Sequence, residues 1–298
     1  MSQLTYLEAI VIGAVQGVSE LFPVSSLGHS VLIPAIVGGS WERDLDVSTP
    51  ESPYLAFIVG LHVATAAALL LFFWRDWVRI LGGLVSSVRH RRMRTPAERL
   101  AWLIIFATIP VGIAGLLLEH VFRDTLGKPI PAASFLIANG VVLYVGERLR
   151  RRAVSTEEPV ANSTDADSDV RLAELSMARG TLIGSAQILA LLAGISRSGV
   201  TMVAGLLRGL SHEDAARFSF LLATPVILAA GVLKLPDLFG PLGAGIHGQI
   251  LAGSVVSFIG AYLAVRFLTR YFHTRTLTPF AIYCVLAGTG SLLWLTLA

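Results

Sequence analysis

The sequence predicts an all-α polytopic membrane protein with about six transmembrane helices and two re-entrant helix–loop–helix segments related as an inverted repeat. Three observations lead to this fold class. The chain of 298 residues is 54% hydrophobic and only 14% charged, whereas a soluble domain has about 25% charged residues. Six apolar runs are long enough to cross about 30 Å of hydrocarbon. Two further apolar segments are interrupted by short polar sequences that break a helix.

The same composition excludes several classes of protein. A soluble enzyme, a disordered chain and a disulfide-rich secreted domain all need a different balance of residues, and the single Cys284 has no partner for an intrachain disulfide. The net charge of +3 comes mainly from arginines that lie between apolar runs. Arginines in this arrangement set membrane topology. We therefore expect membrane lipid as a partner and no nucleic acid.

The predicted elements form two similar halves. Residues 1–153 hold the first broken segment, 6–37, and three spans; residues 180–298 hold the second, 180–209, and three more. The polar and acidic residues 154–179 between them predict a flexible cytoplasmic linker. The six spans are roughly Tyr54–Trp74, Leu100–Glu119, Pro131–Glu147, Asp214–Leu235, Gln249–Leu268 and Thr278–Leu297.

Arginines in the loops predict the orientation. Residues 75–99 contain seven arginines, residues 148–152 contain four, and Arg266, Arg270 and Arg275 surround the last short loop. The positive-inside rule places these three loops in the cytoplasm. Each broken segment must then enter and leave on one side, the first from outside and the second from the cytoplasm. Their tips should meet within the membrane, and both termini should lie outside.

The two broken segments resemble each other at a fixed offset of 171 positions. Gly13–Gln16 corresponds to Gly184–Gln187, and Gly28 corresponds to Gly199. Because the two halves should have opposite orientations, the repeat would be inverted. Such repeats place a polar site near the membrane midplane, between the halves. Chance similarity of two Gly/Ser-rich stretches is the alternative.

Three ionisable residues, Glu20, His29 and Arg197, fall within the broken segments. A charge at membrane depth costs about 2.5–3.5 kcal/mol on insertion scales and usually marks function. None of the three has a charged neighbour within a helical turn. They should therefore meet across the structure or face a water-filled cavity. The alternative is an interfacial loop, in which a charge costs little.

The first break combines oxygen ligands with a candidate nucleophile. Gln16 and Glu20 share a helix face at i, i+4 spacing, where they could hold a divalent cation such as Mg²⁺ or Ca²⁺ or orient a histidine. Ser25, Ser26 and His29 follow, and a hydroxyl near an imidazole is typical of an activated nucleophile.

The second break predicts a phosphate site. A glycine-rich turn that leads into a helix presents N–H groups to an anion, and Arg197 adds a bidentate fork. The supporting donors are Ser196, Ser198, Gly199 and Thr201. A packing interface of small residues is the alternative. His62, within the first span, would either hydrogen-bond to the site or make a structural bond between helices.

These motifs together resemble those of the undecaprenyl-diphosphate phosphatases, also called bacitracin-resistance proteins. That family has an acidic residue or Gln followed four positions later by Glu, then Pro-Val-Ser-Ser-x-Gly-His, and later Pro-Gly-x-Ser-Arg-Ser-Gly-x-Thr. Here the motifs are Gln16–Glu20, Pro23–His29 and Ala193–Thr201, with Ala193 in place of proline. Ser219–Pro225 also resembles the family's segment after the second motif, and the resemblance covers nearly the whole chain.

The resemblance implies an integral enzyme of the bacterial cytoplasmic membrane whose active site faces the outside. It would hydrolyse a C55 isoprenyl diphosphate to the monophosphate and phosphate, which recycles the lipid carrier for cell-envelope synthesis. Carried over by position, Glu20, Ser26, His29 and Arg197 would be central, with Gln16, Ser196, Ser198 and Thr201 in support. No organic cofactor is implied, and both a monomer and a homodimer are compatible with it.

The favoured mechanism has Ser26 attack the terminal phosphorus with His29 as general base, while Glu20 orients the imidazole or binds a divalent cation. In one alternative His29 is the nucleophile, and in another water attacks directly. A competing function is a transporter or flippase of isoprenyl phosphate that uses the same anion site. Ser26 and His29, which simple anion binding does not need, favour the phosphatase.

Overall fold

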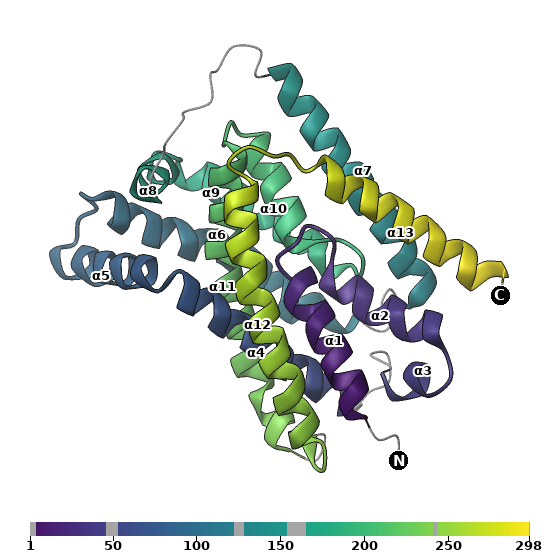
Figure 1. Ribbon diagram of the computed structural model, residues 1–298. Helices are drawn as coiled ribbons and strands as arrows, with labels where there is room; N and C mark the ends of the chain where they lie inside the picture. The colour runs from purple at the N-terminus through teal and green to yellow at the C-terminus, as the bar shows by residue number, and fades with distance from the viewer. Residues whose placement is uncertain (1–3, 46–52, 122–127, 154–164, 241–242, 298) are drawn as a thin grey trace.

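The computed structural model describes residues 4–45, 53–121, 128–153, 165–240 and 243–297, and within these ranges its regular structure is entirely helical (Figure 1). Six helices are long and apolar enough to cross a membrane, which confirms the six predicted spans. They are α4 (Pro53–Phe72), α6 (Pro96–Val121), α7 (Pro129–Ala153), α11 (His212–Phe239), α12 (His247–Tyr271) and α13 (Thr278–Leu297).

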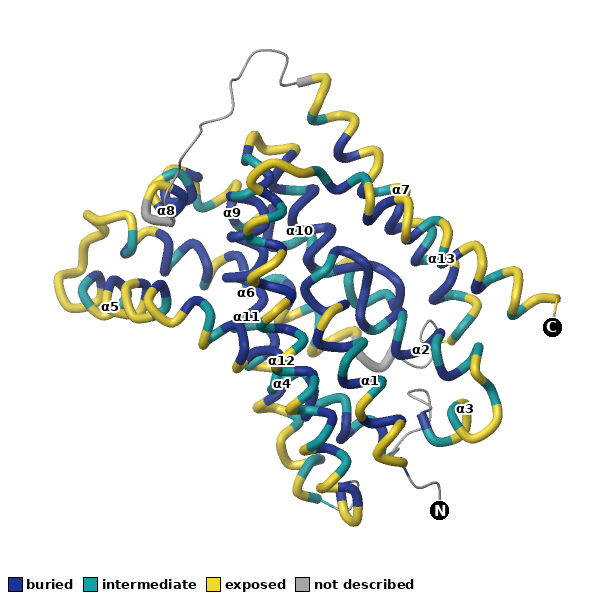
Figure 2. Tube along the Cα trace, viewed as in Figure 1, coloured by how far each residue is buried: buried dark blue, intermediate teal, exposed yellow. Residues whose placement is uncertain are grey.

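Both predicted breaks are present. The first separates α1 (Tyr6–Ser19) from α2 (Ser26–Val37). The second follows α9 (Met177–Ser185) and the 3-10 helix η2 (Ala186–Leu191) and precedes α10 (Arg197–Leu206). The turn between α1 and α2 is largely buried within the molecule (Figure 2), so these polar sequences lie among helices and not at a solvent-exposed edge.

Small residues let the short helices approach their neighbours closely. A Cβ atom at Gly17 of α1 would lie 2.4 Å from the carbonyl oxygen of Ser257 in α12, and one at Gly184 of α9 would lie 2.2 Å from that of Ala107 in α6. At the tips of the two breaks, a Cβ at Gly28 would lie 2.9 Å from Cα of Gly194. The two breaks therefore meet tip to tip, as the sequence predicts.

Helix α5 (Trp74–His90) was not expected from the sequence. The arginine-rich segment 75–99, expected to be a loop, contains this helix. Its buried face, with Ile80 and Gly83, packs on α6, while Val78 and Val85 are exposed. Arginines at the intervening positions obscured this helical pattern in the sequence.

The predicted flexible linker 154–179 is also partly helical. Residues 154–164 lie outside the described part, but α8 (Asp165–Ala173) and the start of α9 occupy the rest. Ion pairs tie α8 to α11: Arg171 to Asp214 at 2.7 Å and Arg217 to Asp169 at 2.9 Å. The polar residues of this segment thus form ion pairs with α11, which the sequence pattern alone does not show. A further short helix, α3 (Ser40–Asp44), follows α2.

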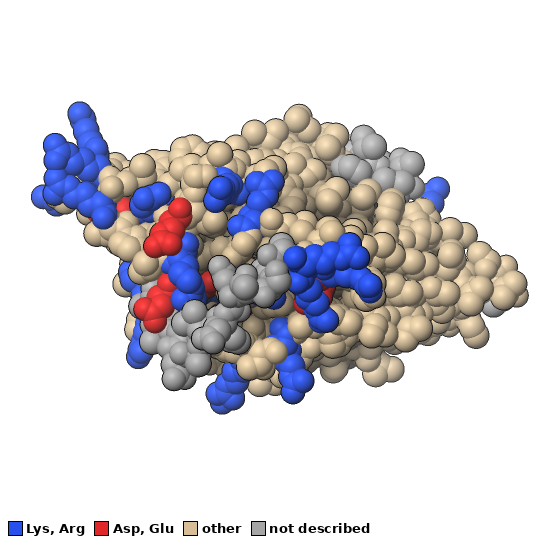
Figure 3. Space-filling model, turned by 90° about the horizontal axis from the view of Figure 1, so that it is seen from above, with Lys and Arg blue, Asp and Glu red and all other residues tan. Residues whose placement is uncertain are grey.

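The arginines of α7 and α12 lie at one end of the molecule. The C-terminal ends of α7 and α12, which carry most of the arginines of two predicted cytoplasmic loops, lie at the same end (Figure 1). Seen from that end, Lys and Arg form separate groups (Figure 3).

The close helix contacts predict that Gly17→Ala and Gly184→Ala each lower the thermal unfolding midpoint in detergent, because the added methyl group meets backbone atoms. Overpacking of this kind costs about 1–3 kcal/mol. Gly112→Ala in α6 is the matched control, since a Cβ there meets nothing within 4 Å. Equal midpoints for all three variants would contradict the predicted packing.

Candidate active site

Glu20 joins the two breaks. It directly follows α1, is 8% exposed, and its carboxylate is shared by groups from both segments. Arg197 donates from Nη2 to Oε1 at 2.6 Å. Gln16 donates from Nε2 to Oε2 at 3.0 Å, and the hydroxyl of Ser26 donates to the same oxygen. A buried carboxylate needs a nearby positive charge and hydrogen bonds, and these contacts supply both. Glu20 and Arg197 thus meet across the structure, as the sequence predicts.

The backbone at Ser25 is strained in a way that fixes Ser26. Ser25 has φ 69°, in the left-handed region, where a residue with a side chain costs of order 1–3 kcal/mol. Its hydroxyl accepts the N–H groups of Gly28 and Gly194, each at 3.2 Å. One serine therefore caps α2 and binds the tip of the second break. Ser26 then stands at the first position of α2, facing Glu20.

The hydroxyls of the second break are already engaged. Ser196 caps α10 by accepting the N–H of Gly199 at 3.2 Å. Ser198 donates to the carbonyl of Phe22 at 3.2 Å, and Thr201 donates to the carbonyl of Arg197 at 2.7 Å. In this conformation these predicted phosphate donors bind backbone groups instead: Ser196 and Thr201 bind within α10, and Ser198 binds across to the first break. Arg197 is the member of this motif that reaches Glu20.

Arg197 keeps one unused donor. Its side chain is 12% exposed, and its Nη1 atom is buried with no hydrogen-bond partner among the described residues. A buried donor without an acceptor costs about 1–3 kcal/mol. Such an atom, on a guanidinium that shares the Glu20 carboxylate with Ser26, is a donor that could bind the oxygen of an anion.

Both ring nitrogens of His29 have partners other than Ser26 in the described part of the chain, so the expected bond between these two side chains is not formed in this conformation. Its Nδ1 lies 2.7 Å from the carbonyl oxygen of Ser25, and its Nε2 lies 2.7 Å from the hydroxyl of Tyr283 in α13. The carbonyl can only accept, so Nδ1 carries the proton, and Nε2 of the neutral ring accepts from Tyr283. These two contacts hold the ring between the N-cap of α2 and α13. The hydroxyl of Ser26 has Glu20 as its partner instead.

The imidazole beside Glu20 belongs to His62. Its Nε2 lies 3.6 Å from Oε2 of Glu20, and its Nδ1 lies 2.9 Å from the carbonyl of Ile58. The sequence left a role at the site open for this residue. The signal in the sequence for such a role is a histidine within an apolar span.

Two residues of the site escaped the sequence analysis. Asn139 in α7 accepts the N–H of Ser196 at 3.0 Å and donates to the carbonyl of Pro23 at 3.1 Å, so it binds both breaks at once. Tyr283 orients His29 from α13. A fully buried asparagine in an apolar run was a usable signal, whereas an exposed tyrosine in the last span was not.

Among the described residues, the side chains at the two breaks do not complete a metal site by themselves. No three His, Cys, Asp or Glu side chains in the described part of the chain come together as ligands. Gln16 offers Glu20 its amide nitrogen, and both Glu20 oxygens already accept hydrogen bonds. Mg²⁺ and Ca²⁺ take about six or more oxygens. Glu20 and Gln16 alone therefore do not fit a resident cation.

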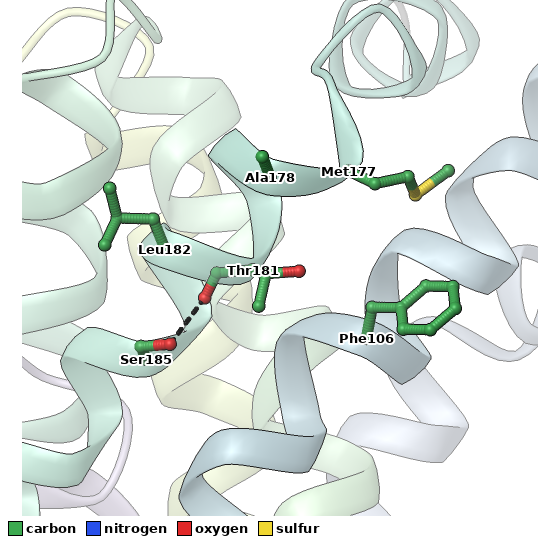
Figure 4. A pocket seen from close by; sticks show the side chains of 6 residues that line it. All are labelled: Phe106, Met177, Ala178, Thr181, Leu182 and Ser185. Atoms are coloured by element: carbon green, nitrogen blue, oxygen red, sulfur yellow. Dashed lines mark hydrogen bonds between the residues drawn. The ribbon is translucent and has the colours of Figure 1, made fainter.

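The pocket shown in Figure 4 is separate from these residues. It has a volume of about 450 Å³, lies between α6 and α9, and contains no ionisable side chain. Ser185 donates there to the carbonyl of Thr181 at 2.8 Å. Its lining residues are Phe106, Met177, Ala178, Thr181, Leu182 and Ser185.

Comparison with known proteins identifies close relatives. The family described as "Bacitracin resistance protein BacA" matches residues 9–290. The chain is 72% identical to the "Undecaprenyl-diphosphatase" of Mycolicibacterium paratuberculosis and to that of Mycobacterium avium, over 99% of each chain. It is 52% identical to "Undecaprenyl-diphosphatase 1" of Frankia casuarinae, over 97% of each chain.

The buried ion pair predicts a non-additive pair of substitutions. Arg197→Met leaves Glu20 charged and without its cation, so we expect a loss of about 3–5 kcal/mol in unfolding free energy. The double variant Glu20→Gln/Arg197→Met removes the stranded charge and should unfold at a higher temperature than Arg197→Met alone. Arg92→Met, at an exposed arginine, controls for loss of charge. A double variant that is no more stable than Arg197→Met would refute the pairing.

Proposed function

Since the chain belongs to the bacitracin resistance protein BacA family, we propose that it hydrolyses undecaprenyl diphosphate to the monophosphate and inorganic phosphate. The reaction returns the lipid carrier to cell-envelope synthesis. The observation that carries this proposal is the free Nη1 of Arg197, whose Nη2 binds the same Glu20 carboxylate that accepts the hydroxyl of Ser26. Phosphoryl transfer depends mainly on positioning and on stabilising charge, and this cluster offers a cation, a nucleophile and a base together.

Ser26 is the nucleophile in the proposed reaction. Its hydroxyl already donates to Glu20, so Glu20 takes the proton as Oγ attacks the terminal phosphorus. The bond from that phosphorus to the bridging oxygen breaks, and the lipid monophosphate leaves with that oxygen. Water then hydrolyses the phosphoserine, releasing phosphate and regenerating Ser26. Arg197 binds the oxygens of the transferred group. Glu20 replaces His29 as the base because His29 is held by Tyr283.

A divalent cation enters the proposal only together with the substrate. Glu20 and Gln16 alone do not complete a coordination shell, and diphosphate oxygens are the remaining ligands such an ion would use. Such an ion would help to hold the diphosphate in place, while Ser26 and Glu20 would keep their roles as nucleophile and base.

We also propose that the two halves form the inverted repeat. Ser25 and Ser196, 171 positions apart, both cap a helix by accepting the N–H three residues later. α1 packs on α12 as α9 packs on α6, and α2 contacts α13 as α10 contacts α7. The arginine-rich ends of α7 and α12 would face the cytoplasm, with the first break reached from outside.

Phosphate release from a C55 isoprenyl diphosphate tests the function. Arg197→Ala and Glu20→Gln should lower the rate at least about 100-fold, as losing one key electrostatic contact does in other enzymes. Ser185→Ala, in the separate pocket of Figure 4, is the matched control and should keep the wild-type rate. Release that survives both site substitutions would refute this catalytic site, whereas no release by the wild type would refute the phosphatase and favour transport of the lipid phosphate.

Trapping the phosphoenzyme tests the nucleophile. After a rapid quench in denaturing detergent at neutral to mildly alkaline pH, which preserves both phosphoserine and phosphohistidine, peptide mapping should find the phosphate on Ser26, and Ser26→Ala should carry none. Phosphate on His29 would overturn the assignment while leaving the phosphatase intact.

Chelation tests the cation. Treatment with a chelator should abolish phosphate release, and Mg²⁺ or Ca²⁺ should restore it. Full activity of the chelated enzyme would show that the reaction needs no divalent cation. It would leave the proposed roles of Ser26 and Glu20 unchanged.

A further inference from the structure

A second basic site lies at the C-terminal end of α12. A pocket of about 440 Å³ there is bordered by three guanidinium groups and has an apolar floor. We propose that it binds the phosphate headgroup of an anionic membrane phospholipid. Its lining residues are Leu263, Arg266, Phe267, Arg270, Tyr271, Thr274 and Arg275.

The positive charge of this pocket is not compensated. Arg266, Arg270 and Arg275 have no carboxylate within 4.0 Å among the described residues. The end of a helix adds only about half a negative charge, so three cations leave the pocket strongly positive. A phosphate diester carries a negative charge, which would offset part of this positive charge. Its oxygens match the donor geometry of the guanidinium groups.

The basic pocket at the end of α7 differs in this respect. There Arg151 donates to the carboxylate of Glu147 at 3.1 Å, and Arg148 donates to the hydroxyl of Tyr144 at 3.0 Å. Two of its arginines thus already have partners within the protein. Of these two pockets, the one on α12 has the uncompensated arginines, and it is therefore the candidate site for an anion.

The floor of the pocket favours a lipid over a soluble phosphate. Leu263 and Phe267 are 56% and 51% exposed, and the exposed Ile259 continues this apolar surface one turn further along α12. Because α12 is one of the six helices that can cross a membrane, its exposed apolar surface borders hydrocarbon. A headgroup held by the arginines would therefore lie at the membrane edge with its acyl chains along the helix.

The pocket also adjoins the candidate active site without sharing its residues. The ring of Phe267 stacks on that of Phe22, with centroids 5.9 Å apart. Phe22 lies in the first break, between Glu20 and Ser26. Lipid binding therefore has to be measured directly and not through turnover, since a change at Phe267 also reaches the site.

Lipid retention in native mass spectrometry tests the proposal. The protein is exchanged into nanodiscs containing equal amounts of phosphatidylglycerol and phosphatidylcholine and then released. Wild type should retain phosphatidylglycerol in preference to phosphatidylcholine. In Arg266→Gln/Arg270→Gln that preference should fall about fivefold for each arginine removed, which is what about 1 kcal/mol per charge corresponds to.

The control removes the same charge elsewhere. Arg89→Gln/Arg92→Gln changes two exposed arginines at the end of α5 and in the loop beyond it, which do not line this pocket, and it should retain lipid as wild type does. An equal loss in both double variants would overturn the site in favour of general attraction. Displacement of the lipid by millimolar inorganic phosphate would also overturn it, because the apolar floor would then contribute nothing.

Discussion

The ion pair between Glu20 and Arg197 is the interaction on which the rest of the site depends. It joins two helix breaks that are far apart in the sequence, and both side chains are buried where a lone charge would be strongly destabilising. Each charge stabilises the other in the buried site, so the two breaks must meet for either charge to be buried. Ser26 and Gln16 then take their places around the same carboxylate.

The surrounding hydrogen bonds convert this pairing into a rigid geometry. Ser25 and Asn139 each bind both breaks, and Ser198 binds the carbonyl of Phe22. These hydrogen bonds engage most of the polar groups at the tips of the two breaks. The free Nη1 of Arg197 is a conspicuous exception. A packed site with an unused cation donor beside a hydroxyl fits the binding and transfer of a phosphoryl group.

Much of this arrangement is predictable from the sequence, because helix breaks and buried charges leave local signals. The six spans, the two breaks and the meeting of Glu20 with Arg197 follow from such signals. The partner of Ser26 does not, since spacing cannot show that His29 turns toward Tyr283 and that His62 lies beside Glu20. Helix α8 could not be predicted for the same reason, because the ion pairs that stabilise it are made with α11.

The most direct test of this account is a structure of the protein with a non-hydrolysable isoprenyl diphosphate, in which a methylene group replaces the bridging oxygen. The account predicts that an oxygen of the terminal phosphate lies within hydrogen-bond distance of Nη1 of Arg197, with the phosphorus next to Oγ of Ser26. A terminal phosphate held by His29 and Tyr283, away from Arg197, would contradict it.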